Sequence, residues 1–301
     1  MVLSMVAQIV GNYLVERGLV TRGQMLVVHK ERQKVRANLG LVAVSEGYMS
    51  SEEAKQIYEE FQTTEGPCDR AFAEVAEERA YMTGGQIRML AYKQSDSYLC
   101  FAQALEKLKI MTFETLNEVL DDFPLATNEM QLDDLKSNDI SRIVPLFLPP
   151  EAKEYVNAAC CALQFLNQKI DANIFPLKAY IADTFAAANG VYQFAKGEKE
   201  YAYAIVARNE EMATLATCYM RERYDGIDEE ILDIISEIVS KISATYATEL
   251  SQDGVLVDLM PAKSYTEMKE VKSEGMLVFE LSVKYETFYL LICVSNEVLI
   301  Y

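Results

Sequence analysis

Residues 228–250 read DEEILDIISEIVSKISATYATEL, and this stretch decides the fold of the C-terminal half of the chain. Its apolar residues recur at the spacing of one helical face, which predicts an amphipathic helix from Asp228 to Leu250. The expected buried stripe consists of Ile231, Ile235, Ile238, Ile242 and Tyr246. The polar residues Asp233, Glu237 and Ser240 recur at i, i+4 and i+7 and therefore share a second face. Such a face is either solvated or a contact surface for a partner.

Further helix and strand patterns flank this helix on both sides. Before it, we expect a helix beginning at Pro150, strands at 174–181, 190–196 and 200–207, and a helix from Asn209 to Tyr224. After it, we expect strands at 255–260, 277–284, 287–294 and 298–301. The strand at 277–284 alternates apolar and mixed positions, which is typical of a half-buried strand. Residues 149–301 are therefore expected to form an α+β two-layer domain with helices packed on an antiparallel sheet.

The first 124 residues contain an internal repeat. Residues 10–21, VGNYLVERGLVT, align with residues 39–50, LGLVAVSEGYMS, at a period of 29 residues. Weaker copies follow at 72–94 and 99–122, with Ala80 and Lys109 in place of the second glycine. Glycine at this position favours the end of a helix, and the Thr or Ser three residues later favours the start of the next. We expect residues 1–124 to form an all-α helical repeat domain, in two pairs divided at 63–67 and followed by a linker at 125–148.

Composition excludes several classes of function. Lys plus Arg number 28 and Asp plus Glu number 46, so the formal charge of −18 disfavours a nucleic-acid partner. No apolar run reaches the roughly 20 residues that cross a bilayer, so we expect no membrane insertion. The six cysteines form no C-x-x-C pair, which indicates free thiols in a reducing cytoplasm. The single histidine, His29, leaves no zinc site or Ser-His triad to expect, and we predict no metal or cofactor of the chain's own.

The pattern Asp233-x-x-x-Glu237-x-x-Ser240, with Pro261 following 21 residues after Ser240, resembles the CheC/CheX family of response-regulator phosphatases. In that family the helix carries [Asp/Ser]-x-x-x-Glu-x-x-Asn. The resemblance covers about half of the chain and implies a cytoplasmic protein of chemotaxis or two-component signalling. It implies docking of a phosphorylated, CheY-like receiver domain through Asp233, Glu237 and Lys241, with Mg²⁺ supplied by the receiver. Glu237 would anchor a lysine of the partner.

Ser240 stands where the family has asparagine, and this difference leaves the activity open. An amide can donate to one oxygen while it accepts from a water, whereas serine is shorter and has one hydroxyl. Losing such an orienting contact could cost on the order of 10²-fold in rate. One interpretation is an aspartyl-phosphate phosphatase with Glu237 and Ser240 as candidate catalytic residues. The other is a degenerate member that docks a receiver without hydrolysing it, as a signalling scaffold.

The CheX-type resemblance also implies a homodimer that pairs through sheet edges. The apolar segments 288–294 and 298–301 are the expected edges. The alternative is that the chain covers these strands with its own residues.

The N-terminal repeat resembles the MshEN domain of type II secretion and pilus ATPases. Some of these domains bind cyclic di-GMP through tandem Arg-Leu-Gly…Gly…Gln motifs. The matching positions are Val10-Gly11, Leu39-Gly40, Gln33 and Gln62. Ile9 and Asn38 occupy the arginine positions, and arginine is the residue suited to bidentate phosphate and guanine contacts. A cyclic di-GMP sensor is therefore a third interpretation, and a helical docking or scaffolding domain is favoured over it.

Overall fold

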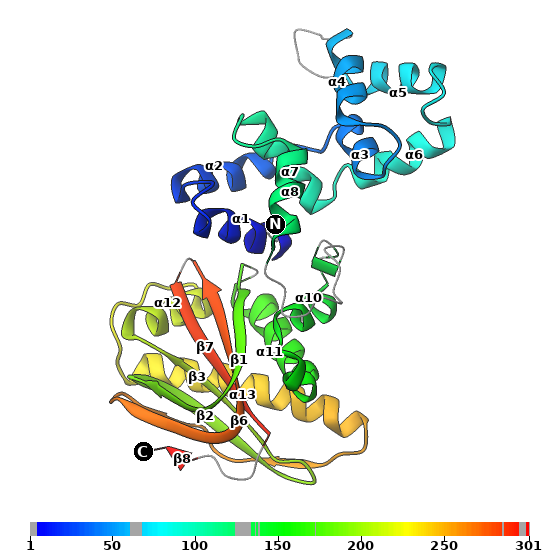
Figure 1. The fold of residues 1–301 in the computed structure, drawn as a ribbon. Coiled ribbons are helices and arrows are strands. Elements are labelled where there is room, and N and C mark those ends of the chain that lie inside the picture. Colours follow the sequence, from blue (N-terminus) through cyan, green and yellow to red (C-terminus); the bar gives the residue numbers. More distant parts are fainter. Residues whose placement is uncertain are drawn as a thin grey trace. The chain divides into compact units, whose positions relative to one another are not determined.

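The computed structural model describes residues 5–60, 68–123, 134–135, 137, 139–171, 173–284, 286–294 and 299–300. The chain divides into two compact units, residues 10–124 and residues 125–301 together with residues 1–9. Figure 1 labels the elements of both. The expected loop at 63–67, the closing Gln62 and a short helix expected near Leu132 lie outside the described residues.

The N-terminal unit is all-α, as predicted. The helices are α1 (Met5–Glu16), α2 (Arg22–Arg32), α3 (Leu39–Ser45), α4 (Ser51–Glu60), α5 (Asp69–Glu78), α6 (Gly84–Lys93), α7 (Ser97–Lys107) and α8 (Phe113–Asp121). Thr21, Thr83 and Thr112 cap α2, α6 and α8, because each side chain accepts a hydrogen bond from the backbone three residues on. Ser50 does the same for α4, accepting from Glu53 N at 3.3 Å. These four caps confirm the predicted helix starts.

The turn before each of these caps has the same left-handed backbone. Gly18 and Gly47 have φ of 70° and 74°, and Ala80 and Lys109 at the corresponding positions both have φ of 57°. Glycine adopts this conformation freely, whereas an L-residue with a side chain is strained there. Ala80 and Lys109 therefore adopt a left-handed backbone conformation that glycine would adopt without strain.

The predicted division of the N-terminal repeats into pairs at 63–67 does not describe their packing. Figure 1 shows α1 and α2 beside α7 and α8, while α3 to α6 form a second group. Arg32 Nη1 donates to Ser97 Oγ at 3.0 Å, and Tyr13 OH donates to the carbonyl of Asp122 at 3.0 Å. A two-helix repeat cannot bury its apolar face alone. The first repeat buries it against the last, and the second against the third.

The C-terminal unit is an α+β domain with an antiparallel sheet, as predicted. Its helical elements are α10 (Ile140–Phe147), the 3₁₀ helix η1 (Pro150–Tyr155), α11 (Val156–Lys169), α12 (Asn209–Met220) and α13 (Glu229–Gln252). Its strands are β1 (Phe175–Ala187), β2 (Asn189–Gly197), β3 (Tyr201–Ala207), β4 (Val257–Leu259), β5 (Lys263–Tyr265), β6 (Lys269–Val283), β7 (Glu286–Cys293) and β8 (Leu299–Ile300). The order is β1-β6-β7-β3-β2-β4, with β5 beside β2 and β8 beside β6.

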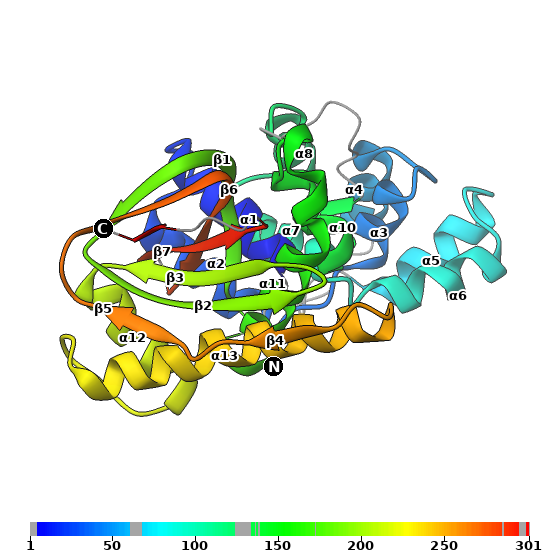
Figure 2. The same ribbon diagram turned by 90° about the horizontal axis from the view of Figure 1, so that it is seen from below.

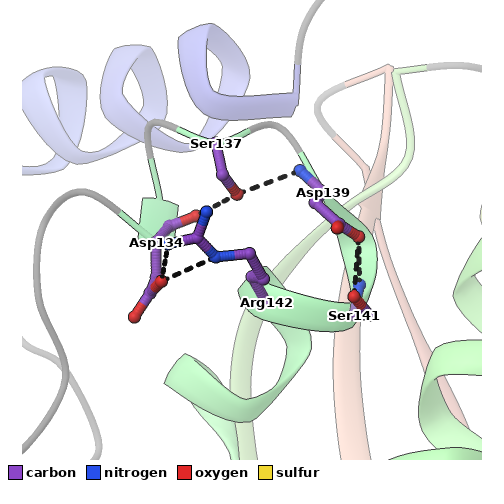
Figure 3. Close-up of polar contacts among 5 residues, drawn as sticks. All are labelled: Asp134, Ser137, Asp139, Ser141 and Arg142. Atoms are coloured by element: carbon purple, nitrogen blue, oxygen red, sulfur yellow. Dashed lines mark hydrogen bonds and ion pairs between the residues drawn. The ribbon is translucent and has the colours of Figure 1, made fainter.

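Helix α10 lies within the segment that we predicted as a linker. Asp139 caps it, since its Oδ1 accepts from Ser141 N at 2.9 Å and from Ser141 Oγ at 2.8 Å. Arg142 Nε donates to Asp134 Oδ1 at 2.8 Å, which ties the helix to the residues before it (Figure 3). The helix packs against α11, so the described part of this segment belongs to the C-terminal unit.

The helix predicted at 209–224 begins at Asn209, as expected, but its predicted end is wrong. Arg208, without a side-chain cap, precedes α12, because the Asn209 side chain instead accepts from Asn189 Nδ2 at 2.8 Å. The helix ends at Met220, where Arg221 takes a left-handed φ of 60°. The prediction had placed this end at Tyr224.

The prediction that β6 is half-buried is also wrong. Val278 and Phe279, on opposite faces, are both fully buried. On the helix-covered face, Tyr203 OH donates to the carbonyl of Ala158 in α11 at 2.9 Å. On the other face a second apolar cluster, which includes Val278 and Leu291, lies under partly buried aromatic side chains such as Tyr192. Because buried side chains pack on both faces of the sheet, the alternation of residue types along β6 does not indicate which residues are exposed.

Residues 288–294 do not form a sheet edge, so this part of the predicted dimer contact is wrong. Strand β7 pairs with β6 on one side and with β3 on the other. Its apolar run is that of an interior strand, buried on both faces. Within the described residues β1 pairs only with β6 and forms an outer strand of the sheet. The homodimer itself stays a prediction.

Candidate functional site

Helix α13 begins and packs as the sequence predicts. Asp228 Oδ1 accepts from Ile231 N at 2.9 Å, which caps the helix. Each residue of the predicted apolar stripe is at most 3% exposed. This stripe faces β2 and β3, and β4 runs alongside the helix (Figure 2). The sheet therefore fixes the orientation of α13 and leaves its polar face outward.

The predicted site residues all lie on this outward part of α13. Asp233, Glu237 and Lys241 are exposed, and Ser240 is half-buried. They follow one another at intervals of three or four residues, the spacing that places side chains on neighbouring turns of one face. Asp233 makes no ion pair with any described residue, so its carboxylate is open to a partner. The face thus offers two carboxylates, a hydroxyl and one ammonium group.

Glu237 is held by two donors from its own chain. Lys241 Nζ lies 2.6 Å from Glu237 Oε1, and Tyr219 OH donates to the same oxygen at 2.9 Å. Lys241 Nζ also donates to Tyr219 OH at 2.6 Å and lies 5.3 Å from the centroid of the Tyr219 ring. The three side chains therefore form a closed hydrogen-bonded ring that joins the end of α12 to the middle of α13.

These contacts set the charge states of the pair. The hydrogen bond from Lys241, followed by that from Tyr219, lowers the pKa of Glu237 below its ordinary value. The hydrogen bond to Glu237 raises the pKa of Lys241. Both side chains are about half exposed, at 51% and 50%, so water and salt screen their attraction. At neutral pH the ring holds an ionised carboxylate and an ionised ammonium whose mutual contact is easily broken.

Tyr219 is the functional candidate that the sequence did not identify. It is the penultimate residue of α12 and belongs to no motif. Its place beside Glu237 depends on α12 and α13 packing against each other, which their separate patterns do not specify. Only the fold brings the phenol to the carboxylate.

The Ser240 hydroxyl differs from those of Ser236, Thr245 and Thr248 on the same helix. Ser236 Oγ donates to the carbonyl of Leu232 at 2.7 Å, and Thr245 and Thr248 bond in the same way to carbonyls four residues earlier. Ser240 makes no such bond within the described part of the chain. Its hydroxyl is therefore available to orient a water or another external group.

An exposed apolar segment accompanies the two short strands that contact α13. Leu256 and Met260 flank β4, with 66% and 38% of their surface exposed. Two hydrogen bonds fix Met260 to β2: its N–H donates to the Phe194 carbonyl at 2.8 Å, and its carbonyl accepts from Gln193 Nε2 at 2.7 Å. Pro261 follows, exposed, between β4 and β5. Both strands contact α13, so this segment lies beside the helix.

In the N-terminal unit, the start of α3 is closed by the chain's own side chains. The N–H groups of Leu39 and Gly40 donate to Asp69 Oδ1 at 2.9 Å and to Tyr58 OH at 3.0 Å. Tyr58 OH and Gln94 Nε2 in turn donate to the two oxygens of Asp69, at 2.7 and 2.5 Å. A Cβ added at Gly40 would meet the Tyr58 ring at 2.5 Å. The Leu-Gly amides that resemble a cyclic di-GMP motif are therefore already bonded, and an acidic group lies beside them.

The described residues contain neither a cluster of metal-ligating side chains nor a membrane-spanning helix. No group of three or more His, Cys, Asp or Glu side chains among them could hold a metal ion. None of their helices is both long and apolar enough to span a membrane.

No protein-family model matches the sequence, and no curated protein matches it. Similar solved structures include chemotaxis proteins. CheX from Vibrio vulnificus is 14% identical with a TM-score of 0.38, covering 46% of this chain and 95% of that one. CheX from Desulfovibrio desulfuricans is 12% identical with a TM-score of 0.41, covering 48% and 99%. A CheX–CheY–BeF₃–Mg²⁺ complex from Borrelia burgdorferi matches at 16% identity and a TM-score of 0.36, covering 48% and 95%. Such similarities by themselves assign neither a family nor an activity.

Proposed function

We propose that this chain docks the phosphorylated receiver domain of a response regulator through the outward face of α13, and that it acts in chemotaxis or two-component signalling. The observation that carries the proposal is the placement of Asp233, Glu237 and Ser240 together on one exposed face of a helix fixed by a sheet. This is the pattern in which the sequence resembles CheC/CheX proteins. A rigid helix holds such a set more accurately than a loop does.

Each residue has a defined task in this docking. Glu237 carries a negative charge at neutral pH and binds a basic side chain of the receiver. Asp233, one turn earlier, adds a second carboxylate to the same surface. The exposed side chains of Leu256 and Met260, which flank β4 beside α13, supply apolar contact area. Mg²⁺ would come with the receiver, where it would neutralise charge on the phosphoryl group.

The proposed reaction is hydrolysis of the receiver's aspartyl phosphate. Little covalent chemistry is asked of the docking protein in phosphoryl transfer, because positioning supplies most of the rate. The free hydroxyl of Ser240 can accept a hydrogen bond from a water and donate one to an oxygen, which would orient that water toward phosphorus. Serine lacks the reach and the second donor of an asparagine amide. We therefore infer weak hydrolysis or docking alone, and the scaffold role remains the second candidate.

The test follows the decay of phosphorylated receivers from the source organism, alone and with this protein, and measures binding in parallel. Glu237→Ala removes the anchoring carboxylate, and Glu229→Ala removes an exposed carboxylate two turns earlier on the same helix as a control. We expect binding that Glu237→Ala weakens about tenfold and Glu229→Ala leaves unchanged. Failure of every receiver to bind would refute the proposal. Binding without faster decay would select the scaffold.

A further inference from the structure

Glu237 and Tyr219 together have the form of a binding site for an ammonium group. Lys241 Nζ donates to Glu237 Oε1 and to Tyr219 OH, both at 2.6 Å, and it lies 5.3 Å from the centre of the Tyr219 ring. A carboxylate, a phenol oxygen and an aromatic ring are the groups that bind a compact cation. We call Glu237 and Tyr219, with this geometry, the ammonium site.

In the free chain, Lys241 fills the ammonium site. It comes from the same helix as Glu237, one turn later, so its occupation needs no partner. Its contacts are about half exposed, and exposed pairs at this spacing contribute little to stability. Lys241 can therefore leave the site at small cost.

A partner lysine at Glu237 is what the resemblance to CheC/CheX proteins implies. We propose that Lys241 is the internal occupant of the ammonium site and that the incoming lysine displaces it. The inference rests on the proposed function, because it concerns the same docking face. It adds Tyr219 as a partner-binding residue. It also changes the role of Lys241, which we had predicted to bind the partner, to that of a competitor for Glu237.

The geometry favours lysine over arginine in the incoming group. Nζ is a point charge with three donors, and two of them are satisfied by oxygens on different helices. A planar guanidinium would need two acceptor oxygens in its own plane. Here one carboxylate oxygen and one phenol oxygen converge on a single point instead.

Removal of the internal occupant is the direct test. The full-length chain is titrated with receivers activated by beryllium fluoride, which holds them in the phosphorylated form without hydrolysis. Lys241→Met keeps the length of the side chain and removes its charge. Because an exposed pair of this kind is weak, we expect Lys241→Met to bind the receiver about two- to fivefold more tightly than the unchanged chain. Tyr219→Phe should bind more weakly.

Two controls separate this exchange from a general charge effect. Lys55→Met breaks another exposed i,i+4 pair, with Glu59 in the N-terminal unit, and changes the net charge equally, so it should leave the affinity unchanged. In a Glu237→Gln background, Lys241→Met should no longer tighten binding, since the group that it frees is gone.

The outcomes also distinguish this inference from the proposed function. If the unchanged chain binds a receiver and Lys241→Met binds equally or more weakly, docking stands and the exchange is refuted. If no variant binds any receiver, the proposed function fails and the exchange fails with it.

Discussion

Ser240 follows Glu237 by three residues on α13, and the two side chains on this face differ in their hydrogen bonding. Glu237 Oε1 accepts from both Lys241 and Tyr219. The Ser240 hydroxyl has no hydrogen-bond partner within the described residues. The Glu237 carboxylate is thus already positioned by hydrogen bonds from its own chain. The Ser240 side chain, which would orient a water, is unbonded in the described part of the chain and shorter than an asparagine.

This relationship predicts that Ser240→Asn increases hydrolysis of the receiver's phosphate. The longer amide adds a donor and extends toward the partner, and an orienting contact of this kind is worth on the order of 10²-fold in rate. The measurement is the decay rate of the phosphorylated receiver. Thr248→Asn, two turns further along α13, introduces the same side chain away from Glu237 and should have no effect. An unchanged rate with Ser240→Asn, at full occupancy of the receiver, would contradict the prediction.

We expect Ala80→Gly and Lys109→Gly to stabilise the protein. Both residues are exposed and have φ of 57°, where an L-residue is strained and glycine is not. The relief exceeds the entropy that glycine adds to the unfolded chain, so each change should raise the free energy of unfolding by about 0.5–1 kcal/mol. Chemical denaturation measures this. Ala73→Gly, within α5, should instead lower it by about 1 kcal/mol, and a loss at all three positions would show that the left-handed turns are not strained.

His29 should make the N-terminal unit sensitive to acid. Burial, with a smaller contribution from the charge of Arg32, lowers its pKa from 6.5 to about 4. Between these two values the unfolded chain binds a proton that the folded chain does not, so the free energy of unfolding falls as pH falls from 6.5 toward 4. The loss amounts to about 3 kcal/mol.

Because His29 is the only histidine, one NMR titration of its ring protons reads this pKa directly. The stability of His29→Gln should fall less than that of the unchanged chain over the same pH range, since both share every other titrating group. A measured pKa near 6.5 would overturn the prediction.

We expect no thermal stabilisation by cyclic di-GMP. The Leu39 and Gly40 amides are already bonded to Asp69 and Tyr58, and the Tyr58 ring covers Gly40. A ligand present at 100 times its dissociation constant would stabilise the chain by about 2.7 kcal/mol, a shift that is easily detected. Differential scanning fluorimetry with the dinucleotide at 100-fold over a micromolar affinity tests this. A clear rise in melting temperature would restore the sensor interpretation.

The sequence by itself determined the elements that depend on local pattern. The 3.6-residue period from Ile231 to Tyr246 specified both the buried and the outward face of α13, and Thr or Ser at the N-caps specified where the N-terminal helices begin. Such signals are readable because neighbouring residues on one helix decide them.

Only the tertiary structure decided which elements meet. The apolar sequence of β7 was consistent with a sheet edge that pairs with a second copy. In the structure β7 lies between β3 and β6. The first N-terminal repeat packs against the last, and Tyr219 reaches Glu237 from another helix. These partners are far apart in the chain, and a local period carries no information about them. The polar face of α13 was therefore predictable, whereas the ammonium site built on it was not.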